Sequence, residues 1–212
     1  MPLTWTRENL FTVTKAYADR YDAEVNANLP EMLALAEDRM SRIMRNREMT
    51  ATVDIIIVDG QEYYDLPSDF AGLRDIKVIP TTGSPTTLQY ITPEQANNVI
   101  KNSGTTTYYN ISANKLRIVN VLSGEGVIEL LYYQRVPPLT DNQSTNWILK
   151  HHGDIYKTAM MAEVEIFVKN DPRAVAFSQQ LQAMFDELDL RDNKDRWSGT
   201  PLATRLENVR GY

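Results

Sequence analysis

The sequence contains no cysteine among its 212 residues, which excludes disulfides and thiolate chemistry. This composition suits a protein that is assembled in a reducing cytoplasm. Long apolar runs are also missing, because no segment approaches the roughly 20 residues that a membrane-spanning helix requires. Met1 leads into polar sequence instead of a basic and then apolar leader. We therefore expect no signal peptide and no membrane partner.

Histidine and positive charge are scarce as well. The chain has two histidines and a formal net charge of −6, so it lacks the overall cationic field that drives binding to a phosphate backbone. No Gly-x-Ser-x-Gly segment is present, which removes the usual signature of a serine nucleophile. These absences favour a structural building block over an enzyme, and we expect no cofactor. The length is enough for one sizeable domain or two small ones.

The first fifty residues predict two helices that pack as an antiparallel hairpin, because the link between them is very short. Asn28 lies three residues before Glu31, with Pro30 in the expected first turn, which is typical of a helix start. Apolar residues recur at three- and four-residue steps in two stripes. The first stripe comprises Leu10, Val13, Tyr17, Tyr21 and Val25, and the second comprises Leu33, Ala36, Met40, Ile43 and Met44.

From residue 50 onward the apolar pattern becomes that of short β-strands. Asp59-Gly60 predicts a two-residue hairpin turn that pairs strands at 53–58 and 62–66. Thr92 is expected to cap a short helix that extends to about Lys101. Short links predict a mostly antiparallel sheet, with further strands at 75–79, 87–91, 105–111, 116–119 and 127–133.

The segment from Tyr63 to Val78 is the most informative part of this region. A strand ends at a proline, a polar turn follows, and an aromatic residue begins the next strand. Ser68 and Asp69 can satisfy the backbone donors of such a turn, and buried aromatic side chains mostly serve packing. A binding edge for a neighbouring subunit is the alternative. We favour a structural joint that consists of Tyr64, Leu66, Pro67, Asp69, Phe70 and Leu73.

The C-terminal third predicts two more helices, at 147–169 and 172–188, with Asp171-Pro172 as the cap and first turn of the second. Their apolar faces are expected to be Ile155, Ala159, Ala162, Ile166 and Phe167, and Val175, Leu181, Met184, Phe185 and Leu188. The fold class is therefore α+β, with a four-helix body and an inserted β module. The expected divisions are a helical hairpin (1–49), the β module (50–138), a helical pair (139–189) and an extended arm (190–212).

Two clusters could carry chemistry. His151, His152 and Asp154 are metal-ligand types, but adjacent residues at a helix start diverge, so they form a poor chelate without distant partners. Asp154 more simply favours the dipole of the helix N-terminus. Glu163 and Glu165 are two residues apart on a helix and do not share a face, whereas a glycosidase needs two carboxylates across a cleft. We expect no metal and no catalytic residues.

Two other groups are candidates for protein interfaces. Arg39, Arg42 and Arg45 lie along one side of the second helix and could dock on an acidic surface or contact DNA. Favourable interaction with the helix dipole, together with solvation, is the stronger single explanation of these arginines. The polar tail carries apolar anchors at a spacing that disordered tails seldom show, and Trp and Tyr are frequent binding hot spots. It binds a partner or folds back over its own helices. The anchors are Trp197, Leu202, Leu206, Val209 and Tyr212.

The motif Tyr64-x-Leu66-Pro67-x-Asp69-Phe70-x-x-Leu73-x-x-Ile76 resembles the head-to-tail adaptor (connector) proteins of tailed bacteriophages. The later segments Asn146-Trp147-Ile148-Leu149, His152-x-Asp154-x-Tyr156, Ala162-Glu163, Phe167, Asp171-Pro172-Arg173 and Ser198-Gly199 resemble that family's C-terminal helical pair and tail. The order of helical hairpin, β insertion, helical pair and arm covers nearly the whole chain.

The resemblance implies a virion protein at the head–tail junction, made in the host bacterial cytoplasm. It implies a dodecameric ring of identical subunits whose helical body docks on the portal protein and whose β module faces a tail or nozzle protein. The arm would reach along the portal, and DNA would pass through the lumen without specific binding. Two alternatives stay open from the residues themselves, namely a tail-associated cell-wall hydrolase and a nucleic-acid-binding module that uses the arginines.

Overall fold

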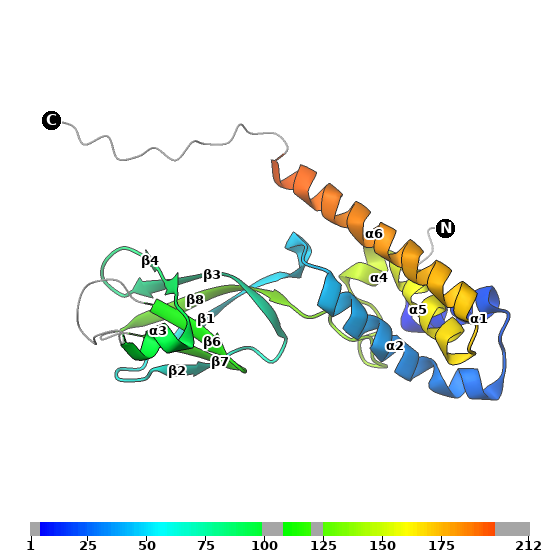
Figure 1. Cartoon of the computed structure of the whole chain (residues 1–212), viewed down its shortest axis with the longest axis horizontal. Coiled ribbons are helices and arrows are strands. Elements are labelled where there is room, and N and C mark those ends of the chain that lie inside the picture. The colour runs from blue at the N-terminus through cyan, green and yellow to red at the C-terminus, as the bar shows by residue number, and fades with distance from the viewer. Residues whose placement is uncertain (1–4, 99–107, 120–124, 198–212) are drawn as a thin grey trace. The chain divides into compact units, whose positions relative to one another are not determined.

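The computed structural model describes residues 5–98, 108–119 and 125–197, apart from the side chains of residues 195–197. This part of the chain has an α+β fold with six α-helices and eight β-strands (Figure 1). The chain divides into two compact units, a helical unit made by 1–47 together with 136–212, and a β unit made by 48–135. The β unit is therefore an insertion in the sequence of the helical unit. The finer division into hairpin, helical pair and arm stays a prediction.

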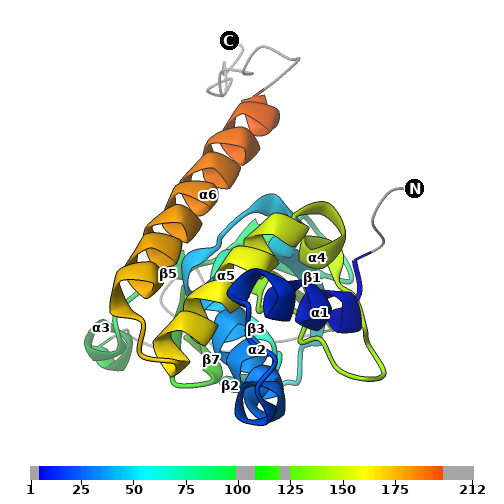
Figure 2. The same ribbon diagram turned by 90° about the vertical axis from the view of Figure 1, so that its right-hand side faces the viewer.

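The helical unit is organised around one almost completely buried helix, α5 (Gly153–Phe167), in which eleven of fifteen residues are buried. Helices α1 (Arg7–Ala18), α2 (Ala23–Ile43), α4 (Trp147–His151) and α6 (Asp171–Trp197) all contact it. Figure 2 shows α5 beside α1, α2 and α6. Apolar residues surround it on several sides, so α5 is the central element on which the other helices pack.

The predicted boundary between the first two helices is wrong. The chain breaks at Asp19, whose φ of 52° is the left-handed conformation that ends α1. Pro30 lies inside α2 instead of in its first turn, because burial of apolar residues on both sides of it outweighs the lost backbone hydrogen bond. Tyr17 and Tyr21 flank the break and are 64% and 66% exposed, so the first predicted stripe is not a continuous buried face.

The helix predicted over 147–169 is broken at His152, which ends α4 and precedes α5. Gly153 follows the break, and a Cβ atom at this position would lie 2.5 Å from the Trp5 ring, so only glycine fits without a shift. The next helix continues through Trp197 instead of ending near Leu188. Within the described residues the helical unit has five helices in place of the expected four, because one predicted helix is two.

The β unit contains two four-stranded sheets. The first has the order β1 (Thr50–Ile56), β8 (Gly126–Gln134), β3 (Phe70–Pro80) and β4 (Thr86–Thr87), and all its pairs are antiparallel. The second has the order β2 (Tyr63–Asp65), β7 (Lys115–Val119), β6 (Tyr108–Ser112) and β5 (Gln89–Tyr90), with only β5 and β6 parallel. The prediction of mostly antiparallel pairing is thus confirmed. A short 3-10 helix (Arg47–Met49) precedes β1.

The hairpin predicted at Asp59-Gly60 is wrong, although the turn itself forms. Gln61 N–H donates to the Val58 carbonyl at 3.0 Å, and Gly60 has a φ of 77°. The flanking strands nevertheless belong to different sheets, because β1 pairs with β8 and β2 pairs with β7. The strand expected over 87–91 is likewise divided, with β4 in one sheet and β5 in the other. Buried Leu88 lies between them.

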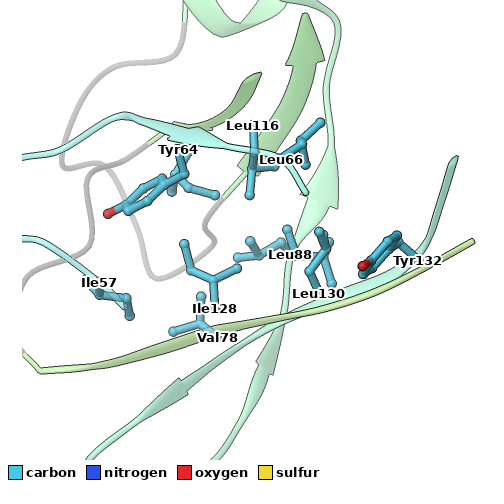
Figure 3. Close-up of a cluster of buried hydrophobic side chains, with 11 residues drawn as sticks. Ile57, Tyr64, Leu66, Val78, Leu88, Leu116, Ile128, Leu130 and Tyr132 are labelled. Carbon is cyan, nitrogen blue, oxygen red and sulfur yellow. The ribbon is translucent and has the colours of Figure 1, made fainter. Parts of the chain in front are cut away.

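The core of the β unit lies between the two sheets. Figure 3 shows side chains from β2 and β7 directed toward side chains from β3 and β8. Alternate residues along each strand supply this core, as the period of two along a strand requires. Its buried residues are Ile57, Tyr64, Leu66, Ile76, Val78, Leu88, Leu116, Ile118, Ile128, Leu130 and Tyr132. Helix α3 (Pro93–Asn98) contacts β6 and begins with the expected Thr92 cap, which accepts from Gln95 N–H.

Candidate interaction surfaces

The segment that was expected to form a structural joint connects β2 of one sheet to β3 of the other. Phe70 N–H donates to the Pro67 carbonyl at 3.0 Å and closes the turn. Asp69 accepts a 3.0 Å hydrogen bond from the Tyr132 hydroxyl, and the Phe70 ring stacks on Tyr132 with centroids 5.8 Å apart. Burial and the Asp69 carboxylate raise the pKa of Tyr132.

The buried members of this segment are Tyr64 and Leu66, whereas Phe70 and Leu73 are half-buried against the same core. These contacts all lie within the β unit. The structural-joint hypothesis therefore needs no partner protein, and it stays a prediction that substitution of Phe70 can test.

The three arginines of α2 have different surroundings in the structure. Arg39 forms an ion pair with Glu163 of α5 at 2.8 Å and a long contact of 3.4 Å with Ser178 of α6. Arg45 donates to the carbonyls of Ser41 and Met44 at the end of α2, which satisfies groups that a helix C-terminus leaves unpaired. Arg42 is exposed. Two of the three guanidinium groups are therefore used within the helical unit.

The tail anchors lie outside the described residues. This applies to the side chain of Trp197 and to Leu202, Leu206, Val209 and Tyr212. The structure adds one fact about the segment before them, because residues 190–197 continue α6. Asp192 on this extension is buried and pairs with Arg47 at 3.5 Å. A truncation that removes only the arm should therefore begin at Ser198.

The two histidines and Asp154 line one pocket of about 250 Å³, together with Met184, Glu187, Leu188 and Arg191 of α6. Sequence spacing could not reveal that α6 supplies these partners. Across the described residues, no group of three or more His, Asp or Glu side chains is arranged to hold a metal ion. Glu163 pairs with Arg39, and Glu165 pairs with Arg173 at 3.0 Å and accepts from Asn170. The two glutamates are therefore held by separate partners on different sides of α5.

An open, mostly apolar groove of about 500 Å³ lies along α6 and the end of α5. Ile166 and Val175 were expected in the core but are 47% and 55% exposed, and Phe167 is 37% exposed. Within the described part of α6, the only buried apolar residues are Ala174, Leu181 and Phe185. The groove is lined by Ile166, Asp171, Ala174, Val175, Ser178, Gln179 and Gln182.

A buried polar network holds the segment through which the chain returns from the β unit. Glu37 of α2 accepts from Leu139 N–H at 2.9 Å and from the Tyr156 hydroxyl at 3.1 Å. Asn146 donates to that hydroxyl and to the Pro137 carbonyl, at 2.6 Å and 2.7 Å. Its side-chain oxygen also accepts from Leu149 N–H and caps α4.

Burial raises the pKa of the Glu37 carboxyl from its ordinary 4.5 to about 7, although these hydrogen bonds and Arg7 oppose the change. Burial also raises the pKa of Tyr156, and the neighbouring Glu37 raises it further. Sequence reasoning missed this network. One signal was available, because Glu37 lies four residues after Leu33 and three before Met40 and so falls on the apolar stripe of its own helix.

No helix in the described part of the chain combines the length and apolar character that crossing a membrane requires. No curated protein matches the sequence. A family described as SU10 adaptor protein matches residues 9–205. This match includes every strand and, apart from the first two residues of α1, every helix described above. The chain belongs to the SU10 adaptor protein family, a family of phage head–tail adaptors.

Proposed function

We propose that this protein is a structural, non-enzymatic virion component that joins the portal to the tail as a ring of identical subunits, through which phage DNA passes. The observation that carries this proposal is the family match over residues 9–205. The match spans both units, so it concerns the whole architecture instead of one motif. Dodecameric stoichiometry and a position at the head–tail junction are part of the proposal.

The helical unit offers a surface suited to the portal. The lining of the groove along α6 is mostly apolar and includes the polar side chains of Asp171 and Gln182, a combination that also occurs in protein interfaces. Val175 and Ile166 are the exposed apolar side chains there. We therefore assign portal docking to this groove, and assign contact with the tail or nozzle protein to the β unit.

Arm capture on the portal is the second element of the proposal. The anchors Leu202, Leu206 and Val209 are apolar residues in an otherwise polar segment, a distribution that purely disordered tails seldom show. An arm that becomes ordered only on binding loses its conformational entropy at assembly. Removal of residues 198–212 should weaken portal binding and leave the free subunit folded.

The direct test is binding of the purified chain to purified portal rings of the same phage, measured by sedimentation and imaged by electron microscopy. We expect a ring of this protein on one end of each portal. Val175→Glu should reduce binding, whereas Ala176→Glu on the same exposed helix, outside the groove lining, serves as the matched control. Absence of binding by the intact chain would refute the proposal, and equal binding by both variants would refute the groove assignment.

A further inference from the structure

The open edge of β1 distinguishes this strand from the other edge strands of the β unit. The two sheets end at β1, β4, β2 and β5. In the described residues β4 and β5 have two residues each and β2 has three, whereas β1 has seven. Very short edge strands are one means by which proteins avoid pairing with other chains. Of these four described edge strands, only β1 is long enough to accept a further strand along most of its length.

The pairing of β1 with β8 determines which backbone groups face the open edge. Ile57 N–H donates to the Gly126 carbonyl, and the register pairs each residue of β1 with β8 without a bulge. In an antiparallel ladder, hydrogen-bonded residues alternate with residues whose N–H and C=O groups point away. The backbone groups of Thr52, Asp54 and Ile56 therefore point outward, and no described strand pairs with them.

The side chains on this strand do not protect the edge. Proteins usually block an exposed edge with charged residues, above all lysine, with proline or with a bulge; β1 contains no lysine, proline or bulge, and Asp54 is its one charged residue. Ile56 is 72% exposed, the largest value among the described large apolar side chains, and Val58 just beyond the strand is 50% exposed. An extended, apolar and unblocked edge is the kind of surface to which another strand adds.

The opposite side of the same sheet offers a complementary partner. Strand β4 pairs only with Lys77 and Val78 of the eleven-residue β3, so the segment Gly72–Asp75 has no described strand on its outer side. The register of β3 against β8 shifts between Leu73 and Asp75, so Arg74 is the extra residue of a β-bulge in this segment. Arg74 in this segment is exposed. Among the described residues, no ion pair involves Arg74 or Asp54 of β1, although Asp54 lies close enough to Lys77 of β3 to help raise the pKa of that lysine. The two edges of one sheet thus carry an exposed cation and an exposed anion.

We infer that β1 of one subunit pairs with the Gly72–Asp75 segment of β3 in the next copy of this chain, with Asp54 facing Arg74. Such contacts join two different edges, so they are heterologous and can continue from copy to copy until a ring closes. A two-fold pairing of β1 with β1 stops at two copies and brings like charges together. The inference deepens the proposed ring and rests on it for the presence of adjacent identical copies.

The absence of native cysteine makes disulfide trapping a clean test. Asp54→Cys and Arg74→Cys are introduced together in the full-length chain, which is then oxidised both free and bound to portal rings. Strand β8 separates the two positions within one subunit, and the registers also offset them along that strand, so their Cα atoms lie more than roughly 10 Å apart, beyond the reach of a disulfide. We expect a ladder of covalent multimers from the double variant, and no ladder from either single variant.

Three controls distinguish the proposed pairing from random collision and from two-fold pairing. A mixture of the two single variants should yield covalent dimers and nothing larger. Asp54→Cys with Ser112→Cys, which lies on the other sheet, should yield no ladder. A ladder from this control would show random collision, and efficient dimers from Asp54→Cys alone would show two-fold pairing. Either result would overturn the inference.

Substitutions without cysteine provide a second test. Ile56→Lys should abolish self-association without changing the melting curve of the subunit, because Ile56 is mainly exposed. Asp54→Arg or Arg74→Asp alone should weaken association by about fivefold, the upper range for an exposed ion pair, and the two together should restore it. Unchanged association in Ile56→Lys would contradict strand pairing.

The two proposals can fail separately. Binding to portal rings without a disulfide ladder would refute strand pairing and leave the adaptor function intact. A ladder without any binding to portal rings would leave strand pairing intact and refute portal joining.

Discussion

Glu37→Gln provides a quantitative test of the buried network in the helical unit. Glutamine keeps a side-chain oxygen that can accept from Leu139 N–H and from the Tyr156 hydroxyl, but it cannot ionise. The wild-type carboxyl has its pKa raised from 4.5 to about 7, mainly by burial. Between these two values the folded state binds more protons than the unfolded state, so the stability of the wild type falls as the pH rises.

The magnitude follows from the size of the pKa shift. Each pKa unit corresponds to about 1.4 kcal/mol, so the full shift corresponds to about 3 kcal/mol of unfolding free energy. This contribution is fully present below about pH 4.5 and is lost as the pH rises through about 7. The variant lacks the ionisable group. Relative to its value at low pH, the stability of the variant should exceed that of the wild type by less than about 1 kcal/mol near pH 5 and by about 3 kcal/mol near pH 8.

The assay is urea unfolding of both proteins at several values between about pH 5 and pH 8, followed by far-UV circular dichroism. This signal reports mainly on the helical unit, because five of the six described helices belong to it. Other titrating groups contribute equally to both proteins, so the difference isolates Glu37. Tyr156→Phe removes a hydrogen bond that lowers the pKa of Glu37. The loss of stability that accompanies ionisation of Glu37 should therefore occur at a higher pH in this variant. Parallel pH profiles for wild type and Glu37→Gln would refute the reasoning.

Three further substitutions test packing and pairing. Phe70→Ala should lower the free energy of unfolding by about 2 kcal/mol, which is less than for a fully buried ring because Phe70 is half-buried. A melting curve like that of the wild type would contradict the role of Phe70 at the joint. Gly153→Ala should lower the free energy of unfolding by about 1–3 kcal/mol, because the new Cβ atom would lie 2.5 Å from the Trp5 ring. A double-mutant cycle with Trp5→Ala should show coupling between the two positions. Arg39→Met should lower the free energy of unfolding by about 2 kcal/mol, because it leaves the largely buried Glu163 unpaired. The addition of Glu163→Gln should recover most of this stability. No recovery would argue against the ion pair.

Much of the local structure follows directly from nearby residues. Thr92 and Gln95 form a reciprocal capping box at the start of α3, as their spacing predicts. Strands β6 and β7 pair across the two residues Ala113 and Asn114, in line with the predicted strands on either side. The arginines and the joint motif could be identified as candidates from sequence, but their partners could not, because Arg39 meets Glu163 over a separation of more than a hundred residues.

The sequence by itself determined the lack of thiol chemistry, the presence of helices at both ends and strands between them, and the resemblance to phage adaptors. The first two features depend on composition and on periodicities of 3.6 and 2 residues, which near neighbours specify, whereas the resemblance depends on particular motifs such as Tyr64-x-Leu66-Pro67-x-Asp69-Phe70. Only the tertiary structure decided that β1 pairs with β8, that Glu37 is buried, and that Ile166, Val175 and Ile56 are exposed. An apolar pattern indicates that a side chain can be buried, but the residues that cover it come from distant parts of the chain or from another subunit.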